Sequence, residues 1–188
     1  MNCEIDINNA VEVLRKGGVI LYPTDTIWGI GCDATNAEAV ARIYKIKQRE
    51  ESKAMICLVD KPDRMQRYFR NIPDVAWDMA DLATSPLTII LDGANGVAPN
   101  LIAEDGSLGM RVTREEFSRQ LCYKLQRPLV STSANVSGEP SPRNFYDIPD
   151  SIKEQVDYIV QFRRGDKAPH EPSKIVKIKL DGEVKVIR

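Results

Sequence analysis

The decapeptide LVSTSANVSG, Leu129–Gly138, ends a short apolar segment with a run of small polar side chains. An apolar run that stops in this way is typical of a buried strand followed by a loop. The hydroxyls of Ser131 and Ser133 and the amide of Asn135 then have two explanations. They form either a solvated loop or a cradle of short hydrogen-bonding groups around a polyanion, and the remaining sequence has to decide between these.

Outward from this stretch, short apolar runs alternate with helical patterns. Strands are predicted at residues 19–23, 54–59, 87–91, 108–112, 128–132, 157–162, 173–180 and 183–188, the last two joined by the hairpin signal Asp181-Gly182. Helices are predicted at residues 7–18, 37–50, 61–70, 73–83 and 113–125. Asn36 is the predicted N-cap of the second helix, and Thr113–Glu116 is a predicted capping box for the last.

This mixture of hairpins and helical crossovers predicts an α/β (mixed α+β) fold, with a twisted mixed sheet and helices packed against it. The length of 188 residues predicts a single domain over 1–188. A long ordered loop is expected at Ser137–Asp150, which is rich in Ser, Pro and Gly.

Composition excludes several classes of protein. The net charge of −1 argues against a protein that grips nucleic acid through bulk charge. No apolar run reaches eighteen residues and the N-terminus is acidic, so we expect no membrane span, no secretion signal and a cytoplasmic location. The four cysteines are far apart in the sequence and are expected to be free thiols, and the one histidine, His170, has no nucleophile placed beside it.

Four polar stretches lie at the ends of predicted strands, where open α/β sheets usually bind ligands. The first group is Thr24–Thr26, the second is the cationic run around Lys47 and Arg49, and the fourth is the opening stretch. In the third, Arg111 lies within the apolar run LGMRV and needs a partner, either an internal carboxylate or a ligand anion. The familiar phosphate loops GxxxxGK[ST] and GxGxxG are absent, so hydroxyls and scattered cations would have to hold any nucleotide.

Taken together, these stretches resemble the YrdC family of threonylcarbamoyladenylate synthases. The motifs occur in family order as GGVILYPTDTIWGIG, IYKIKQREESKAMICLV, SPLTIIL, GSLGMRV, PLVSTSANVSGEPSP and PSKIV. The resemblance implies a three-layer fold around a concave ligand site, in the short form of the family. It implies a nucleotidyltransferase that makes L-threonylcarbamoyladenylate and pyrophosphate from L-threonine, bicarbonate and ATP. The product would serve the N6-threonylcarbamoylation of tRNA, with tRNA and the downstream transfer proteins as further partners.

The resemblance also assigns residues. It implies that ATP contacts Lys47, Arg49, Thr88, Ser131, Ser133, Asn135 and Arg188, and that threonine contacts Thr26, Lys53, Arg111 and Ser173. The reaction needs no covalent nucleophile, so Lys47 and Arg49 would act by positioning and by stabilising charge. Mg²⁺ would arrive with ATP, held mainly by the phosphates and water rather than by protein ligands.

Three positions depart from the family pattern: Ser85 replaces a common glycine, Glu50 a proline, and Lys174 a threonine beside the amino-acid site. Because of Lys174, the alternative that the chain is a non-catalytic paralogue that binds nucleotide or RNA stays open, although the intact SAN motif favours the synthase. The carbamoyltransferases of hydrogenase maturation share the fold, but their cysteine clusters are missing here.

Overall fold

The computed structural model describes residues 3–50, 55–168 and 170–188. Within this part of the chain the strands form one nine-stranded mixed sheet. In order across the sheet, the strands are β7 (Tyr158–Ile159), β1 (Ile20–Tyr22), β2 (Gly29–Gly31), β6 (Leu129–Ser133), β3 (Ile56–Val59), β5 (Leu108–Val112), β4 (Leu87–Leu91), β8 (Lys174–Ile178) and β9 (Val184–Val186). The pairs β1–β7, β3–β5 and β4–β8 are parallel and the others antiparallel, which confirms the predicted mixed sheet.

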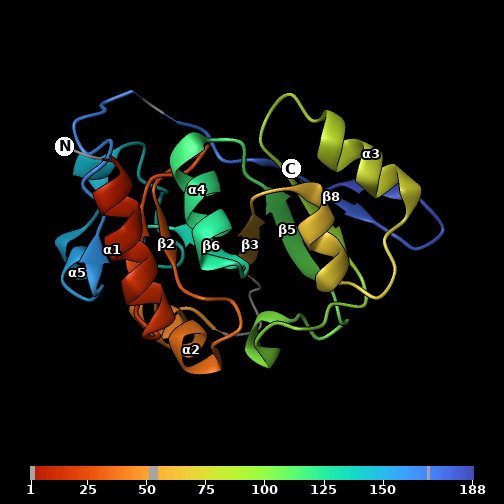
Figure 1. The fold of residues 1–188 in the computed structure, drawn as a ribbon, viewed down its shortest axis with the longest axis horizontal. Helices are drawn as coiled ribbons and strands as arrows, with labels where there is room; N and C mark the ends of the chain where they lie inside the picture. Colours follow the sequence, from red (N-terminus) through yellow and green to blue (C-terminus); the bar gives the residue numbers. More distant parts are fainter. Residues whose placement is uncertain (1–2, 51–54, 169) are drawn as a thin grey trace.

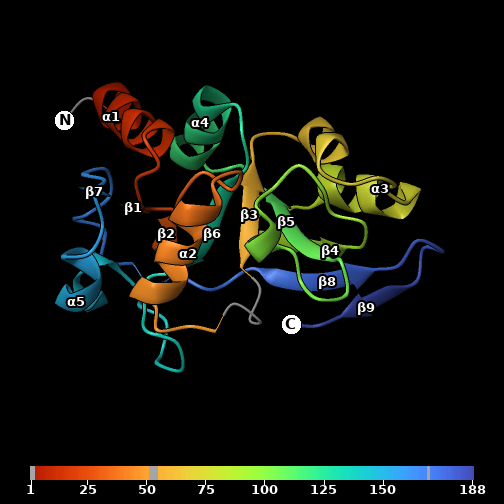
Figure 2. The same cartoon turned by 90° about the horizontal axis from the view of Figure 1, so that it is seen from below.

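Helices flank this sheet (Figure 1). They are α1 (Cys3–Arg15), α2 (Ala37–Ile46), α3 (Asp74–Leu82), α4 (Glu116–Leu125) and α5 (Asp150–Lys153), with short 3₁₀ helices η1 (Pro62–Arg67), η2 (Pro99–Leu101) and η3 (Phe145–Asp147). Figure 2 shows α1, α4 and α3 along one side of the sheet, with β8 and β9 at its far end. Among the described residues, no helix has the length and apolar character that crossing a membrane requires.

The first two helices form for the predicted reasons. In α1, Ile7, Val11 and Leu14 recur on one face and are buried against the core. In α2, the side chain of Asn36 accepts hydrogen bonds from the backbone N–H groups of Glu38 and Ala39, both at 3.1 Å. Such a cap stabilises a helix by about 1 kcal/mol, and it fixes where α2 begins.

The capping box predicted for α4 is wrong. The N-cap is Glu115, whose carboxylate accepts from the backbone N–H groups of Phe117 at 3.0 Å and Ser118 at 2.8 Å. Thr113 is not available as a cap because its own N–H donates to Val59 O at 3.0 Å, which extends the ladder beside β3. Its hydroxyl pairs instead with that of Ser118, at 2.7 Å.

Three further elements differ from the sequence prediction. Residues 61–70 form only the 3₁₀ helix η1, and the loop expected at Ser137–Asp150 contains η3. The strand β2 is not among the predicted strands, yet it pairs with both β1 and β6. Its Gly31 is required by packing, since a Cβ atom there would lie 2.5 Å from Val130 O.

The predicted hairpin between β8 and β9 is confirmed. Gly182 has a φ of +87°, which favours glycine, and Lys179 N donates to Glu183 O at 3.0 Å. This turn returns the chain along β8 and leads Arg188 back toward the middle of the molecule.

Candidate active site

Most of the predicted site residues line one pocket on the sheet, called here the polar pocket. It has a volume of about 190 Å³ and is lined, among others, by Thr26, Arg49, Thr88, Arg111, Ser131, Ser133, Ser173 and Arg188. Successive side chains of a strand point to opposite faces, so β4 and β5 each turn one polar residue, Thr88 and Arg111, into this pocket. Residues far apart in sequence therefore meet, as the resemblance implied.

The sequence left open whether Arg111 pairs with an internal carboxylate or with a ligand anion, and the structure provides for both. Its side chain is 3% exposed, and its Nη2 lies 2.9 Å from Asp25 Oδ1 and donates to Thr26 Oγ1 at 3.3 Å. It also lines the polar pocket, where a ligand anion would meet it. The ion pair is not well aligned, because Asp25 Oδ1 and Arg111 Nε have no hydrogen-bond partner among the described residues. The guanidinium thus retains capacity for a further acceptor.

Asp25 is a residue of this site that the sequence assignment missed. Burial raises the pKa of its carboxyl group, while the nearby charge of Arg111 lowers it. Its carboxylate balances the charge of Arg111, although Asp25 itself does not line the polar pocket. The signal that could have found it was present, since a carboxylate between two threonines directly follows a buried strand.

Hydroxyl groups in the pocket pair with one another. Thr88 Oγ1 and Ser173 Oγ lie 2.9 Å apart, and Arg188 Nε donates to Ser173 O at 3.1 Å. On the other side, Thr26 Oγ1 lies 2.9 Å from Thr24 Oγ1, which also receives the Thr26 backbone N–H at 3.0 Å. These pairs fix hydroxyl positions, so a bound anion would meet preoriented donors.

Lys47 is placed differently from the prediction of a direct phosphate contact. It is 1% exposed and lies behind the pocket wall. Its Nζ donates to the carbonyl oxygens of Ser133 and, at 2.7 Å, of Asn135, and its own carbonyl accepts from Ser137 N at 2.9 Å. Burial, and secondarily the charge of Arg49, lowers the pKa of Lys47 to about 7. In this structure the ammonium group therefore ties the end of α2 to the SAN loop.

Asn135 also lies behind the wall rather than on it. Its Nδ2 donates to Glu139 O at 2.7 Å and to Val136 O at 3.1 Å, which closes the loop after β6. Ser131 and Ser133 line the pocket from the end of β6, together with Thr132 between them. The Asn135 side chain, expected to contact ATP, does not line the polar pocket, since its amide is used within the loop.

Two lysines complete the list of expectations. Lys53, expected at the amino-acid site, lies outside the described residues. Lys174 is exposed at the start of β8, and it is the neighbouring Ser173 that lines the pocket. Arg49 does line the pocket, and burial lowers its pKa.

The pocket also has an apolar part that the sequence assignment did not name. Met55, Ile56 and Ile175 line it, and Trp28 adds an indole whose ring centroid is 5.0 Å from that of Phe145. Strand periodicity would have identified Ile56, but Trp28 required knowledge that β2 is a strand. In the described part of the chain, no group of three or more His, Cys, Asp or Glu side chains could hold a metal ion.

Known proteins are similar to this chain in sequence and in fold. Residues 12–188 match the model of the Sua5/YciO/YrdC family, which carries the description "Telomere recombination". A threonylcarbamoyl-AMP synthase of Pseudoalteromonas translucida is 32% identical over 187 residues, 98% of this chain and 98% of that protein. E. coli YciO superposes with a TM-score of 0.85 at 28% identity, over 100% of this chain and 89% of its own.

A second solved structure, P. abyssi Sua5 complexed with L-threonine, has a TM-score of 0.85 over 97% of this chain and 53% of that chain. At 22% identity this likeness shows the fold alone. The family match and the P. translucida relative extend over nearly all of the sequence. The chain therefore belongs to the Sua5/YciO/YrdC family.

Proposed function

We propose that this protein is an L-threonylcarbamoyladenylate synthase that uses L-threonine, bicarbonate and ATP. The observation that carries the proposal is the polar pocket, in which three arginines and several paired hydroxyls from distant segments converge. Cations and preoriented hydroxyls suit a substrate set in which carboxylate, carbamate and phosphate are all anionic. Curated relatives named threonylcarbamoyl-AMP synthase support the same reading.

The threonine end of the pocket is assigned to Arg111 and Thr26. Arg111 keeps an unpartnered Nε among the described residues, and a substrate carboxylate would complete its hydrogen bonding. The hydroxyl of Thr26 lies within the same cluster, 3.3 Å from Arg111 Nη2. A solved relative holds L-threonine, as its name states.

The nucleotide end is assigned to Ser131, Ser133, Arg49 and Arg188. All four line the polar pocket, with Ser131 and Ser133 on β6 and Arg188 bonded to Ser173 O beside the Thr88–Ser173 hydroxyl pair. Lys47 and Asn135 would act from behind by fixing the SAN loop. Mg²⁺ would enter as the ATP complex, with phosphates and water as its main ligands.

The chemistry then follows from positioning. The threonine amine attacks bicarbonate and forms a carbamate with loss of water; a carbamate oxygen then attacks the α-phosphorus of ATP, and pyrophosphate leaves. Arg49 and Arg188 would stabilise the charge that develops on the phosphates, and a fixed geometry would supply much of the rate enhancement. We infer that the product serves tRNA modification, which would place the protein in the cytoplasm.

The test is mass spectrometry of the products formed from MgATP, bicarbonate and L-threonine, with each component omitted in turn. We expect threonylcarbamoyl-AMP and pyrophosphate only when all are present. Arg49→Ala should remove charge-assisted hydrogen bonds worth about 1.5–3 kcal/mol, so turnover should fall roughly 10–150-fold. Lys45→Ala, an exposed cation at the same helix end, is the matched control and should change turnover less than twofold.

The alternative is a non-catalytic paralogue that binds nucleotide or RNA, and Lys174 is the residue that favours it. The exposed position of Lys174 makes L-threonine acceptable as substrate, so Lys174→Thr should change threonine affinity only modestly. Serine, which lacks one methyl group, should be poorer by roughly 10–200-fold. If nucleotide binds but no pyrophosphate appears with threonine and bicarbonate, the paralogue replaces the synthase.

A further inference from the structure

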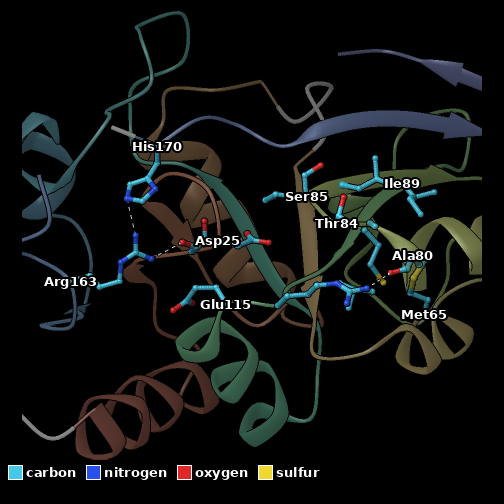
Figure 3. A pocket seen from close by; sticks show the side chains of 16 residues that line it. Asp25, Met65, Ala80, Thr84, Ser85, Ile89, Glu115, Arg163 and His170 are labelled. Atoms are coloured by element: carbon cyan, nitrogen blue, oxygen red, sulfur yellow. Dashed lines mark hydrogen bonds between the residues drawn. The ribbon is translucent and has the colours of Figure 1, made fainter. Parts of the chain in front are cut away.

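A second and larger hollow, called here the apolar cavity, lies on the other side of the sheet. Its volume is about 350 Å³, within the usual range for small-molecule sites. Its walls include Met65, Ala80, Ile89, Met110 and Val112. Figure 3 shows Asp25 in the middle of the lining, with Arg163 and His170 on one side and Met65, Ala80 and Ile89 on the other.

The two hollows lie back to back across the same strands. On β5, Met110 and Val112 line the apolar cavity while Arg111 between them lines the polar pocket. On β4, Leu87 and Ile89 alternate with Thr88 in the same way. This alternation is a direct result of strand geometry, and it makes the apolar cavity distinct from the proposed substrate site.

The cations at the cavity are already engaged with acceptors. Arg163 donates to Thr24 O at 3.1 Å and to Asp166 Oδ2 at 3.1 Å, and it contacts His170 Nε2 at 2.9 Å. Arg114 donates to the carbonyl oxygens of Ala80 and Asp81 at the end of α3. An anionic ligand would have to displace these bonds, so the cavity does not favour an anion.

The carboxylates at the cavity differ from each other. Glu115 uses its carboxylate to cap α4. The Asp25 side chain is 9% exposed, and its Oδ1 has no hydrogen-bond partner among the described residues although Arg111 lies nearby. Burial, and to a smaller extent the negative charge of Glu115, raises the pKa of Asp25, so Arg111 only partly offsets the deficit of favourable interactions around the ionised carboxylate. A hydrogen-bonding cation on the cavity side would correct this deficit.

We propose that the apolar cavity binds a compact apolar molecule that carries a primary amine, with the ammonium group on Asp25 and the apolar body among Met65, Ile89, Met110 and Val112. The bound amine acts on the polar pocket through Asp25. A cation beside this carboxylate offsets its field at Arg111, so Arg111 attracts a substrate carboxylate more strongly. By linkage, substrate and amine then strengthen each other's binding by the same factor. This second step rests on the proposed function, whereas the binding step does not.

The binding test uses 2-phenylethylamine as the probe and protein labelled at the methyl groups of Met and Ile, followed by NMR titration. The resonances of Met65, Met110 and Ile89 should shift and saturate. Met55 and Ile56, which line the polar pocket, are internal controls and should not shift. The neutral isostere 2-phenylethanol should bind at least about tenfold more weakly, because one charge-assisted hydrogen bond is lost.

Two variants make the result specific. Ala80→Leu fills the cavity from α3 and should weaken amine binding at least about tenfold. Threonine binding measured without amine should be unchanged in this variant. If Ala80→Leu does not fold, Ala83→Leu, which lies nearer the rim of the cavity, takes its place. Asp25→Asn keeps the shape and removes the charge, so amine and alcohol should then bind within about twofold of each other. Shifts at Met55 and Ile56 instead of Met65 and Met110, or equal binding of amine and alcohol to the unaltered protein, overturn the proposal.

The coupling test measures L-threonine affinity by calorimetry, with MgATP present and with or without saturating amine. We expect threonine to bind about fivefold or more tightly with amine. Unchanged affinity with the amine bound overturns the coupling. Failure of threonine to bind under any condition overturns the proposed function instead, and the methyl shifts at Met65 and Met110 distinguish the two failures.

Discussion

At the scale of single residues, the Asp25–Arg111 pair shows how one buried charge determines another. Arg111 is 3% exposed and its carboxylate partner lies 2.9 Å away. Removing one partner from a buried ion pair leaves an uncompensated charge, so Asp25→Asn should lower the free energy of unfolding by about 3–5 kcal/mol. It should also weaken L-threonine binding, because Arg111 loses the contact that orients it, and this loss should outweigh the removal of a negative charge beside Arg111. Urea denaturation and calorimetric titration measure the two effects.

The chain offers a matched control in Asp60, which pairs with Arg64 at 2.9 Å with side chains 8% and 9% exposed. Asp60→Asn removes a buried charge of the same kind away from the polar pocket. It should cost comparable stability and leave threonine affinity unchanged. If both variants bind threonine equally well, Asp25 has only a structural role.

The buried Lys47 should make the stability of the folded protein depend on pH. Its pKa is lowered from 10.5 to about 7 in the folded protein, so between these values the unfolded chain binds more protons than the folded one. Stability contributed by this group therefore rises with pH across that window, by at most about 1.4 kcal/mol per pH unit. Below about pH 7 both states are protonated and the slope disappears.

The measurement compares urea denaturation of the protein and of Lys47→Met across this pH range. Met fills similar space and does not titrate, so the difference between the two curves isolates the lysine. Parallel curves would mean that the carbonyl oxygens of Ser133 and Asn135 keep the ammonium group charged at all these pH values.

At the scale of elements, the sequence was informative where a pattern is local. Asn36 capped α2 as predicted, and the Asp181-Gly182 hairpin formed, because each depends on neighbours within a few residues. Prediction failed where distant pairing decided the outcome. Thr113 resembled an N-cap, but a hydrogen bond to Val59 O, more than fifty residues away in sequence, keeps it extended and leaves capping to Glu115.

The candidate site shows the same difference between what local patterns predict and what long-range contacts decide. The motifs predicted which strand ends carry hydroxyls and cations, and the structure gathers most of these in the polar pocket. They did not predict that Lys47 would face the backbone of the SAN loop, or that Asp25 would pair with Arg111. Those facts depend on how β6 and α2, and β1 and β5, are brought together in three dimensions, and a motif carries no such information.

The strand β2 yields an expectation at this scale. A Cβ atom at Gly31 would lie 2.5 Å from Val130 O and 2.7 Å from Tyr22 Cε1, which would force β1, β2 and β6 apart. Gly31→Ala should therefore destabilise the protein by about 1–3 kcal/mol or more and reduce turnover, since Gly29 and Ser133 pair at the pocket. Gly165→Ala, with nothing within 4 Å, is the control for a glycine replacement and should do neither. A thermal melt that is unchanged in both variants would contradict this packing.

At the scale of the whole molecule, the pocket is lined by segments from distant parts of the sheet. Thr26 follows β1 and Arg188 follows β9, and the strands between them form one continuous sheet. A ligand that contacts such distant segments holds them together, so its binding should stabilise the entire fold. If residues 1–188 form one domain, we therefore expect the chain to unfold cooperatively, with and without ligand.

MgATP together with L-threonine should raise the melting temperature of the protein as one unit. At a ligand concentration about 100 times the dissociation constant, binding stabilises the folded state by about 2.7 kcal/mol, which corresponds to roughly 5–11 °C for a protein of this size. In Trp77→Phe, fluorescence reports on Trp28 beside the pocket, while far-ultraviolet circular dichroism reports on all helices and strands. Both signals should give the same melting temperature and the same shift on binding. A ligand-induced shift seen by Trp28 alone would mean that the pocket region unfolds separately from the β8–β9 end of the sheet.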